Sequence, residues 1–560
     1  MKKKSRKTKV THPQPTAEPV NRSPLIRRAE LICALILTLV VVLLHAYRAS
    51  QAGGLWRDEV STIGAATLPS LGKLWDSLIY ESSFPLLVYL VVHSWTGVHW
   101  LGSGDGSLRV LGALIGVGGL AALWLTTRML GRRVPIVALV FLGLNATVIQ
   151  WGDSMRAYGL AAIWILLVYG AVWKFIESPT PARLALATVL SFLSVQSLYQ
   201  NAFLVLAICF GAFLVCLRRR VWKTILLLFA MGAVSAISLI AYLPKIAVSK
   251  AIHMVADLPM PFSYVLQMFA TAVGSGSSFL LWTWLLFSGV CIVAAIRVIA
   301  QETRKRESSR RLDLAIYSLT VLLASAVMYV LLVKALNFLP QAWYFVVLVA
   351  IIAVSLDDLV GLVATTVPAR AASLALVLVL AAATIYIGRK QVSERLTNID
   401  VIAPLLAERS GDGDFIVVSP WYVGVTFRYY FHGNTPWTTI PPISDLQLTR
   451  YDLLKEQMMK ADPMQPVLEG AERALRSGKS VWAVGGLAAP PEGQLPPRLP
   501  PAPNAPSGWN NGPYISAWIL QLGAFIQSHA TAMETMPVPI RQPVNVYEDS
   551  PVLVFHGWRP

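Results

Sequence analysis

The sequence predicts an all-α polytopic membrane domain of about eleven transmembrane helices with interfacial helices, followed by a small extracytoplasmic α/β domain. Of the 560 residues, 55% are hydrophobic and only 14% are charged, and the mean hydropathy is +0.57. Soluble domains carry about 25% charged residues, so a soluble class is excluded. The formal charge of +17 comes mainly from Lys and Arg in short loops between apolar runs, where they set orientation. It therefore does not indicate nucleic-acid binding.

Residues 1–30 form a basic tail that begins MKKKSRKTK. The first apolar run, residues 31–47, is long and lacks a clear small-residue cleavage site. We therefore expect a cytoplasmic tail and a retained membrane helix. All four cysteines lie inside apolar runs, which predicts neither disulfides nor a thiolate metal site. We expect no required cofactor, and no set of ligands in the sequence supports the alternative of a divalent metal.

Eleven uncharged runs approach the roughly 20 apolar residues that a membrane helix needs. They lie near residues 31–47, 110–127, 134–151, 157–173, 184–198, 199–217, 224–244, 279–296, 314–333, 339–356 and 371–388. We assign residues 31–389 to one transmembrane domain, with a first outer loop over residues 48–106.

A twelfth apolar run, residues 85–100, is shorter and contains His93 and His99. If this run does not cross, the Lys- and Arg-rich loops all face the cytoplasm, as the positive-inside rule requires. If it crosses, those loops face outward. We therefore predict an interfacial helix, with a short buried span as the alternative. The two histidines are six residues apart and do not share a helix face well, so we interpret them as interfacial residues and not as metal ligands.

From residue 390 the chain becomes polar and rich in proline, which predicts a small α/β domain outside the membrane over residues 390–560. Strands are predicted at 414–420 and 480–484, and helices at 450–477 and 516–532. Residues 489–506 are proline-rich and predict a loop. Residues 544–547 and 551–555 flank Glu548, Asp549 and Ser550, which predicts a β-hairpin.

The ionisable residues outside the basic loops gather at the predicted outer membrane surface. Asp58 and Glu59 follow the first span, Glu81 precedes the interfacial run, and Asp153 and Arg156 lie between the third and fourth spans. Ion pathways and proton relays place such residues at mid-depth instead. The pattern favours an enzyme that joins a lipid-linked anionic donor to an outer acceptor. The alternatives are a non-enzymatic flippase or transporter of lipid-linked glycans, and an assembly scaffold.

Several segments resemble, in their order and spacing, motifs of GT-C membrane glycosyltransferases. The nearest likeness is to the bacterial branch related to protein O-mannosyltransferases, lipid A aminoarabinose transferases and Rgt-type lipopolysaccharide-core galacturonosyltransferases. The matching segments are Trp56–Glu59 (WxDE-type), Ser83–Tyr89 (HPPLYY-like), Ser107–Gly116 (LRLPSALFG-like), Gly131–Arg133 (GRR) and Trp151–Leu160 (SQEARMYAL-like). Phe415–Pro420 followed by Tyr429–Gly433 resembles the family's outer domain. The likeness covers about residues 30–200 well and the remainder only in architecture. The chain departs from the family at Ser83 and Phe84, where the family has histidine and proline, and at Ser154, where it has glutamate.

The resemblance implies transfer of a sugar from a polyprenyl-phosphate carrier to a glycan, lipid or protein acceptor outside the cytoplasm. Asp58 occupies the place of the family's first-loop acid, so we expect it to take the proton of the acceptor hydroxyl, with inversion at the anomeric carbon. Glu59 is the second candidate catalytic acid. It could orient Asp58, bind the acceptor or face water.

The leaving group is a lipid phosphate, which favours a charge-assisted contact with arginine. Arg156 is the first candidate for this contact, with Arg57 and Lys73 behind it. The alternative role for Arg156 is anchoring to lipid headgroups. Three further residues are candidates for contact with the acceptor or for support of the site: Asp153, Glu81 and Tyr158. For Asp153 the alternative to contact with the acceptor is to hold Arg156.

Overall fold

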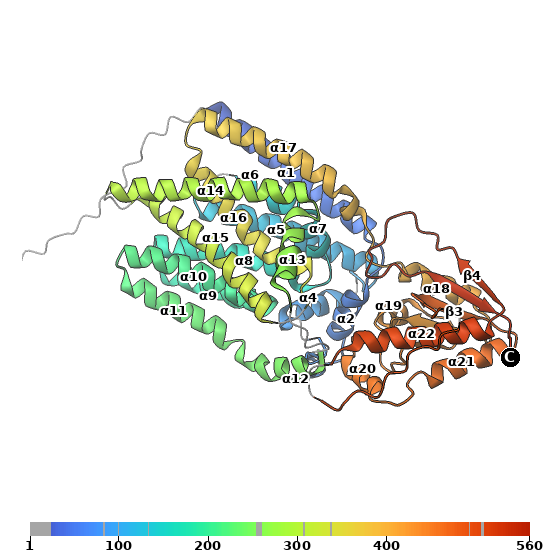
Figure 1. Ribbon diagram of the computed structural model, residues 1–560. Helices are drawn as coiled ribbons and strands as arrows, with labels where there is room; N and C mark the ends of the chain where they lie inside the picture. The colour runs from blue at the N-terminus through green and yellow to red at the C-terminus, as the bar shows by residue number, and fades with distance from the viewer. Residues whose placement is uncertain are drawn as a thin grey trace, which may run out of the picture.

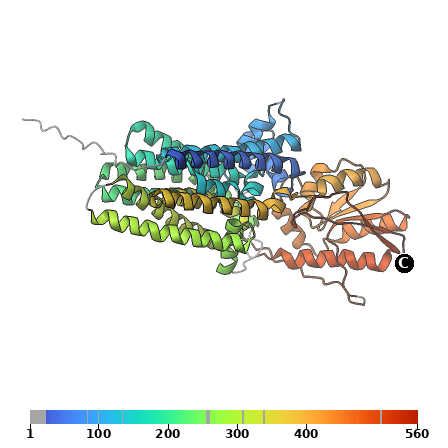
Figure 2. The same ribbon diagram turned by 90° about the horizontal axis from the view of Figure 1, so that it is seen from above.

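The computed structural model describes residues 24–81, 84–98, 100–132, 134–253, 260–305, 309–336, 339–491, 493–505 and 509–560. The basic tail up to residue 23 lies outside the described residues, as do Ser83, His99 and Arg133. A long bundle of helices continues at one end into a domain with a β-sheet (Figure 1). The view from above shows the two parts following one another along the same long axis (Figure 2). The predicted helical membrane domain followed by a small α/β domain is confirmed.

Nine helical segments within the described residues are long and apolar enough to cross a membrane. They are formed by α1 (Pro24–Gln51), α5 (Asp105–Met129), α8 (Ala157–Glu177), α10 (Asn201–Arg218), α11 with η2 and α12 (Trp222–Ile237, Ile240–Tyr242 and Leu243–His253), α14 (Ser278–Arg304), α15 (Arg310–Ala335), η3 with α16 (Ala342–Phe345 and Val346–Val363) and α17 (Val367–Ser393).

The two other predicted spans also run from end to end of the bundle. Helix α9 (Pro181–Ser197) has 17 residues. Residues 134–151 form a broken crossing made of α6 (Ile136–Ala138), the π-helical turn η1 (Leu139–Gly143) and α7 (Ala146–Gly152). Asn145 ends the break because its side chain caps α7 at the Val148 N–H, 3.1 Å away. Broken helices are tolerated at membrane depth where protein covers the freed backbone groups, and Asn145 is buried.

The predicted cytoplasmic loops meet at one end of the bundle. Arg219, after α10, pairs with Asp313 of α15 at 2.6 Å. Arg310, at the start of α15, pairs with Glu177 at the end of α8 at 2.5 Å. These contacts join loops that the positive-inside pattern places on a single side.

The run 85–100 does not connect the two ends of the bundle. Its helix, α4 (Leu86–Thr96), has 11 residues and spans only about 16 Å. Phe84, just before it, lies against Arg156. Asp105, after it, accepts a hydrogen bond from Tyr430 of the sheet domain at 2.6 Å. Both flanks of α4 therefore lie at the end of the bundle that contacts the sheet domain. Two short helices precede α4, α2 (Arg57–Ala66) and α3 (Leu71–Ser77), and α13 (Phe262–Gly274) precedes α14.

The sheet domain is built on five strands in the order β2-β1-β3-β5-β4. Strands β1 (Phe415–Ser419), β2 (Trp437–Thr439) and β3 (Val481–Gly485) are parallel, and β5 (Val552–His556) runs antiparallel to β3 and to β4 (Ala532–Met536). The helices are α18 (Ile399–Arg409), α19 (Val423–Tyr430), α20 (Tyr451–Met458), α21 (Gln465–Arg476) and α22 (Asn511–His529). The predicted strands at 414–420 and 480–484 therefore form.

The predicted hairpin of 544–547 with 551–555 is wrong. Strand β5 pairs with β4 instead, and residues 544–547 make only one isolated bridge, between Val544 and Arg395. The physical reason is Glu548, which is buried and accepts hydrogen bonds from the hydroxyl of Thr426 and the N–H of Arg57. These contacts hold residues 544–548 beside the helical bundle, where the segment cannot pair with β5.

The side of the membrane on which each end lies can be tested with single exposed cysteines. Ser103 and Ser477 lie at the end with the sheet domain and Ser178 at the other, and all three are exposed. In cells with a permeable outer envelope and the native cysteines replaced, Ser103→Cys and Ser477→Cys should react with a membrane-impermeant thiol reagent. Ser178→Cys should react only after membrane lysis. The opposite labelling pattern would place the sheet domain in the cytoplasm.

Candidate active site

The site is organised by the first turn of α2. Trp56 is extended (φ −88°, ψ 168°), and the carboxylate of Glu59 accepts its N–H at 3.3 Å. This is the backbone contact of a capping box, and it starts the helix at Arg57. Carboxylates in a first helical turn are stabilised by the helix dipole. The residues that resemble the family's acidic motif thus also fix the local backbone.

Glu59 is fully buried, with 0% of its surface exposed. Its two carboxylate oxygens lie 2.7 and 3.0 Å from the guanidinium nitrogens of Arg109 in α5, and it also accepts the N–H of Met155 at 2.9 Å. Arg109 in turn donates to the carbonyls of Gly53 and Gly54. The alternative that Glu59 faces water is therefore wrong. Because protein donors occupy both of its oxygens, Glu59 is suited to hold the backbone of the site in position and not to accept a proton.

Asp58 is the exposed acid of the site, with 28% of its side chain accessible. Arg57 Nε lies 3.5 Å from one carboxylate oxygen and Arg156 Nη2 lies 3.8 Å from the other. Arg156 also donates to the Asp58 carbonyl at 3.1 Å and to the Thr62 hydroxyl at 3.0 Å, and its guanidinium lies 4.4 Å from the centre of the Phe84 ring. The carboxylate of Asp58 is thus held between two cations with one face open.

Glu81 is a second carboxyl in contact with Arg156, whose Nη1 lies 3.8 Å from it. The Ser61 hydroxyl donates to Glu81. Burial raises the pKa of Glu81 to about 7, although Arg156 opposes the shift. Asp58 and Glu81 therefore share one guanidinium, as the sequence grouping suggested, but they differ in exposure.

Asp153 does not join this group. It is buried and pairs with His45 of α1, whose Nδ1 lies 2.8 Å from the carboxylate. Asp153 was expected to hold Arg156, but its carboxylate contacts His45 instead. Lys73 is exposed on α3, and no side-chain interaction joins it to Asp58 among the described residues.

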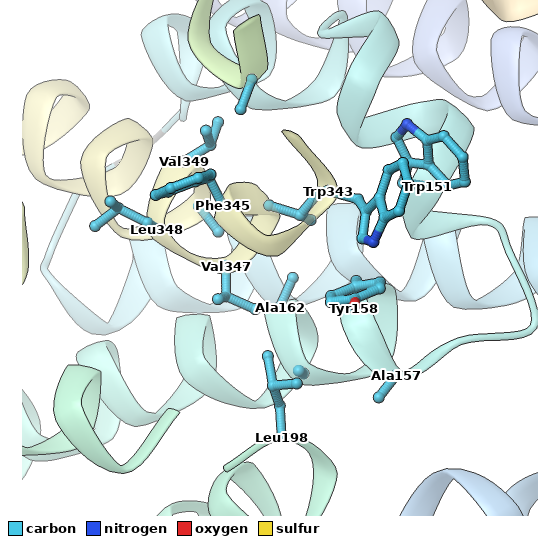
Figure 3. Close-up of a cluster of buried hydrophobic side chains, with 14 of the residues drawn as sticks. Trp151, Ala157, Tyr158, Ala162, Leu198, Trp343, Phe345, Val347, Leu348 and Val349 are labelled. Carbon is cyan, nitrogen blue, oxygen red and sulfur yellow. The ribbon is translucent and has the colours of Figure 1, made fainter. Parts of the chain in front are cut away.

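Tyr158 lies in the wall of the site beside an apolar cluster. Its ring is 5.5 Å from Phe84 and stacks 6.1 Å from Tyr344. Figure 3 shows Tyr158 below Trp343 and next to Ala162, with the rings of Trp151 and Trp343 side by side. Those two rings are 4.1 Å apart. Trp151, Tyr158 and Trp343 are buried, and Tyr158 is close enough to Arg156 and Asp58 to interact with their charges. The aromatic layer therefore forms an apolar wall beside these two residues.

The sheet domain completes the site, which the sequence did not predict. Arg57 donates to the carbonyl of Tyr547 at 3.2 Å, and its backbone N–H donates to Glu548 at 3.0 Å. The Arg57 guanidinium lies 4.4 Å from the centre of the Tyr422 ring. Burial raises the pKa of Glu548 to about 7. The available signal is the pair of acids Glu548 and Asp549 between two apolar segments, a pattern that by itself predicts a turn.

The described residues contain no group of three or more His, Cys, Asp or Glu placed to hold a metal. At the outer site, Asp58 and Glu81 lie against arginine and not against further acids or histidines. The charges of this arrangement suit recognition of an anion next to a proton acceptor.

No protein-family model and no curated protein matches the chain. Among solved structures, the oligosaccharyltransferase of Archaeoglobus fulgidus in complex with Zn and sulfate matches with 14% identity and a TM-score of 0.46. That match covers 80% of this chain and 67% of the other. ArnT from Cupriavidus metallidurans bound to undecaprenyl phosphate matches with 12% identity and a TM-score of 0.36, over 80% of this chain and 92% of the other. Both TM-scores lie below 0.5 and both identities below 25%, so neither match carries an argument about the role of this chain or of any of its residues.

The distinct roles of the two adjacent acids can be separated by stability. Glu59→Gln leaves Arg109 buried without its counter-charge, which should destabilise the protein by about 3–5 kcal/mol. Asp58→Asn changes a partly exposed side chain and should leave the thermal unfolding temperature close to wild type. Both variants would be measured by thermal unfolding of the purified protein in detergent.

The double variant Glu59→Gln/Arg109→Gln is the control for this comparison, because it removes both charges together. It should unfold at a higher temperature than Glu59→Gln alone. If Glu59→Gln unfolds at the wild-type temperature, the pair does not hold the site.

Proposed function

We propose that the protein is an integral membrane glycosyltransferase that moves a sugar from a polyprenyl-phosphate donor to an extracytoplasmic acceptor. The observation that carries the proposal is the partly exposed carboxylate of Asp58, which lies between Arg57 and Arg156. The motif resemblance over about residues 30–200 supports the same class. The acceptor is a cell-envelope glycan, lipid or protein, and the transferred sugar is a hexose or a pentose.

In the proposed reaction, the acceptor oxygen attacks the anomeric carbon while the bond from that carbon to the phosphate oxygen breaks. The acceptor proton passes to Asp58, and the electron pair of the broken bond leaves with the carrier phosphate. One direct displacement inverts the anomeric centre. An acceptor hydroxyl is a weak nucleophile until its proton is taken in the transition state, so a positioned carboxylate is the group that this step needs.

The two arginines supply charge for the leaving phosphate. An arginine contact to phosphate is charge-assisted and stronger than a neutral hydrogen bond. Arg57 and Arg156 also lie against Asp58, so a bound phosphate would share their charge and leave the Asp58 carboxylate more basic. Donor binding would then prepare the base for the acceptor. Glu81, on the other side of Arg156, would help to hold that guanidinium in place.

Asp58→Asn should abolish transfer, because the amide keeps the size of the side chain and loses its basicity. Transfer would be measured with purified protein, a polyprenyl-phosphate sugar and membrane extract as acceptor. Asp76→Asn is the matched control, since Asp76 is an exposed acid of the same outer loop and should retain activity. Near wild-type transfer by Asp58→Asn would contradict the proposed base. Failure of the wild-type protein to transfer sugar would instead favour the alternative of a flippase or transporter.

Arg156→Ala should weaken use of the donor more than use of the acceptor. Loss of one charge-assisted hydrogen bond costs about 1.5–3 kcal/mol, so the KM for donor should rise roughly 10- to 150-fold. Arg156→Lys keeps the positive charge, so its KM for donor should lie between that of wild type and that of Arg156→Ala.

The control for Arg156→Ala is Arg428→Ala, which removes an exposed cation on α19 of the sheet domain and should leave both KM values unchanged. A normal KM for donor in Arg156→Ala would reassign Arg156 to holding α2 through the Asp58 carbonyl and Thr62.

A further inference from the structure

A charged cavity lies at the end of the bundle opposite to Asp58. It has a volume of about 650 Å³, within the range of small-ligand sites. It is enclosed by α1, α15, α16, α17 and the loop between α5 and α6. Five arginines and two acids line it: Arg27, Arg132, Arg310, Arg311, Arg370, Glu30 and Asp357. Nothing in the proposed transfer reaction uses this cavity.

Three of the five arginines are neutralised by acids. Arg132 pairs with Asp358 at 2.5 Å, Arg310 pairs with Glu177, and Arg370 pairs with Glu30. The last acid of the lining, Asp357, accepts the backbone N–H groups of Val137 and Ala138. It makes no ion pair within 4 Å among the described residues.

Of the five arginines in the lining, Arg27 and Arg311 make no ion pair with any described residue. The Nε atom of each is buried and has no hydrogen-bond acceptor. Arg311 donates through Nη2 to the carbonyl of Leu362 at 2.8 Å. Glu302, an acid close enough to interact with the charge of Arg311, is itself bonded to Lys305 and Ser309. A buried donor left without an acceptor costs free energy, and more so in a charged group.

The chemistry that satisfies two such guanidinium groups is a phosphate anion, whose oxygens accept several hydrogen bonds at once. Basic pockets between membrane helices on the cytoplasmic side bind anionic lipid headgroups. The surroundings favour a lipid as the source. Leu374 and Val377 of α17 line the cavity, and α1 and α17, which lie side by side in Figure 1, expose leucines and valines such as Leu35, Leu39 and Val379 along their outer faces.

We propose that this cavity, which we call the inner arginine cavity, binds the phosphate of an anionic membrane lipid through Arg27 and Arg311. The headgroup lies between the two guanidinium groups, and the acyl chains follow the outer faces of α1 and α17. The site is independent of the proposed transfer reaction at Asp58.

The full-length protein would be placed in nanodiscs of phosphatidylcholine with or without phosphatidylglycerol, and retained lipids would be counted by native mass spectrometry. Wild type should retain phosphatidylglycerol after delipidation and unfold at a higher temperature when it is present. Arg27→Gln/Arg311→Gln should lose at least 10-fold of this retention. The matched control is Arg28→Gln/Arg304→Gln, which removes two exposed arginines, one in the first turns of α1 and one at the end of α14. This control should behave as wild type.

A second variant covers the case in which the double arginine variant fails to fold. Ser373→Glu places a carboxylate at a half-buried position of the lining, where it can take the place of the anion. It should fold without anionic lipid and should not retain phosphatidylglycerol. Normal retention by Ser373→Glu would overturn the proposal.

The two remaining outcomes also decide the question. If inorganic phosphate added to phosphatidylcholine nanodiscs stabilises wild type but not Arg27→Gln/Arg311→Gln, and phosphatidylglycerol has no effect, the cavity binds a soluble phosphate and the lipid assignment is overturned. If both double variants lose phosphatidylglycerol equally, retention reflects general surface charge and the site is refuted.

Discussion

The buried ion pair between Glu59 and Arg109 is the interaction on which the outer site depends. Buried charges persist when they are paired and their remaining hydrogen-bonding capacity is used. Glu59 meets this condition with N–H groups from Trp56 and Met155 as well as the guanidinium. The pair ties the start of α2 to α5 and to the segment before α8. Asp58 therefore has a fixed backbone although its side chain is partly exposed.

Two adjacent acids acquire opposite roles because a helix turns by about 100° per residue. At the first turn of α2, that rotation sends Glu59 into the protein and leaves Asp58 at the surface beside Arg57 and Arg156. The residue type is nearly the same, so the difference comes from burial and partners alone. A motif that contains both acids cannot by itself say which one is free to accept a proton.

The features that the sequence could predict are those with a local signal. Hydropathy and loop charge predict the spans and the single end of the bundle at which the basic loops meet. They also predict that α4 begins and ends at the same end of the bundle. The partners of the acids could not be predicted in this way. Glu59 and Arg109 are 50 residues apart, and Arg57 and Glu548 are 491 apart. His45, which holds Asp153, lies within an apolar run that predicts only a membrane span. A charge partner set by tertiary packing leaves no periodicity in the chain.

The segment wrongly predicted as a hairpin is a second example of a partner set by tertiary packing, because its residues belong to the wall of the site. Tyr547 and Glu548 hold Arg57 through its side chain and its backbone, so the sheet domain fixes one of the two cations beside Asp58. If Asp58 activates the acceptor as proposed, the acceptor must approach along a surface that the sheet domain helps to form. The bundle then supplies the base and Arg156, and the sheet domain restricts what reaches them. Acceptor choice would follow from residues far from the spans, in the part of the chain where the motif resemblance is weakest.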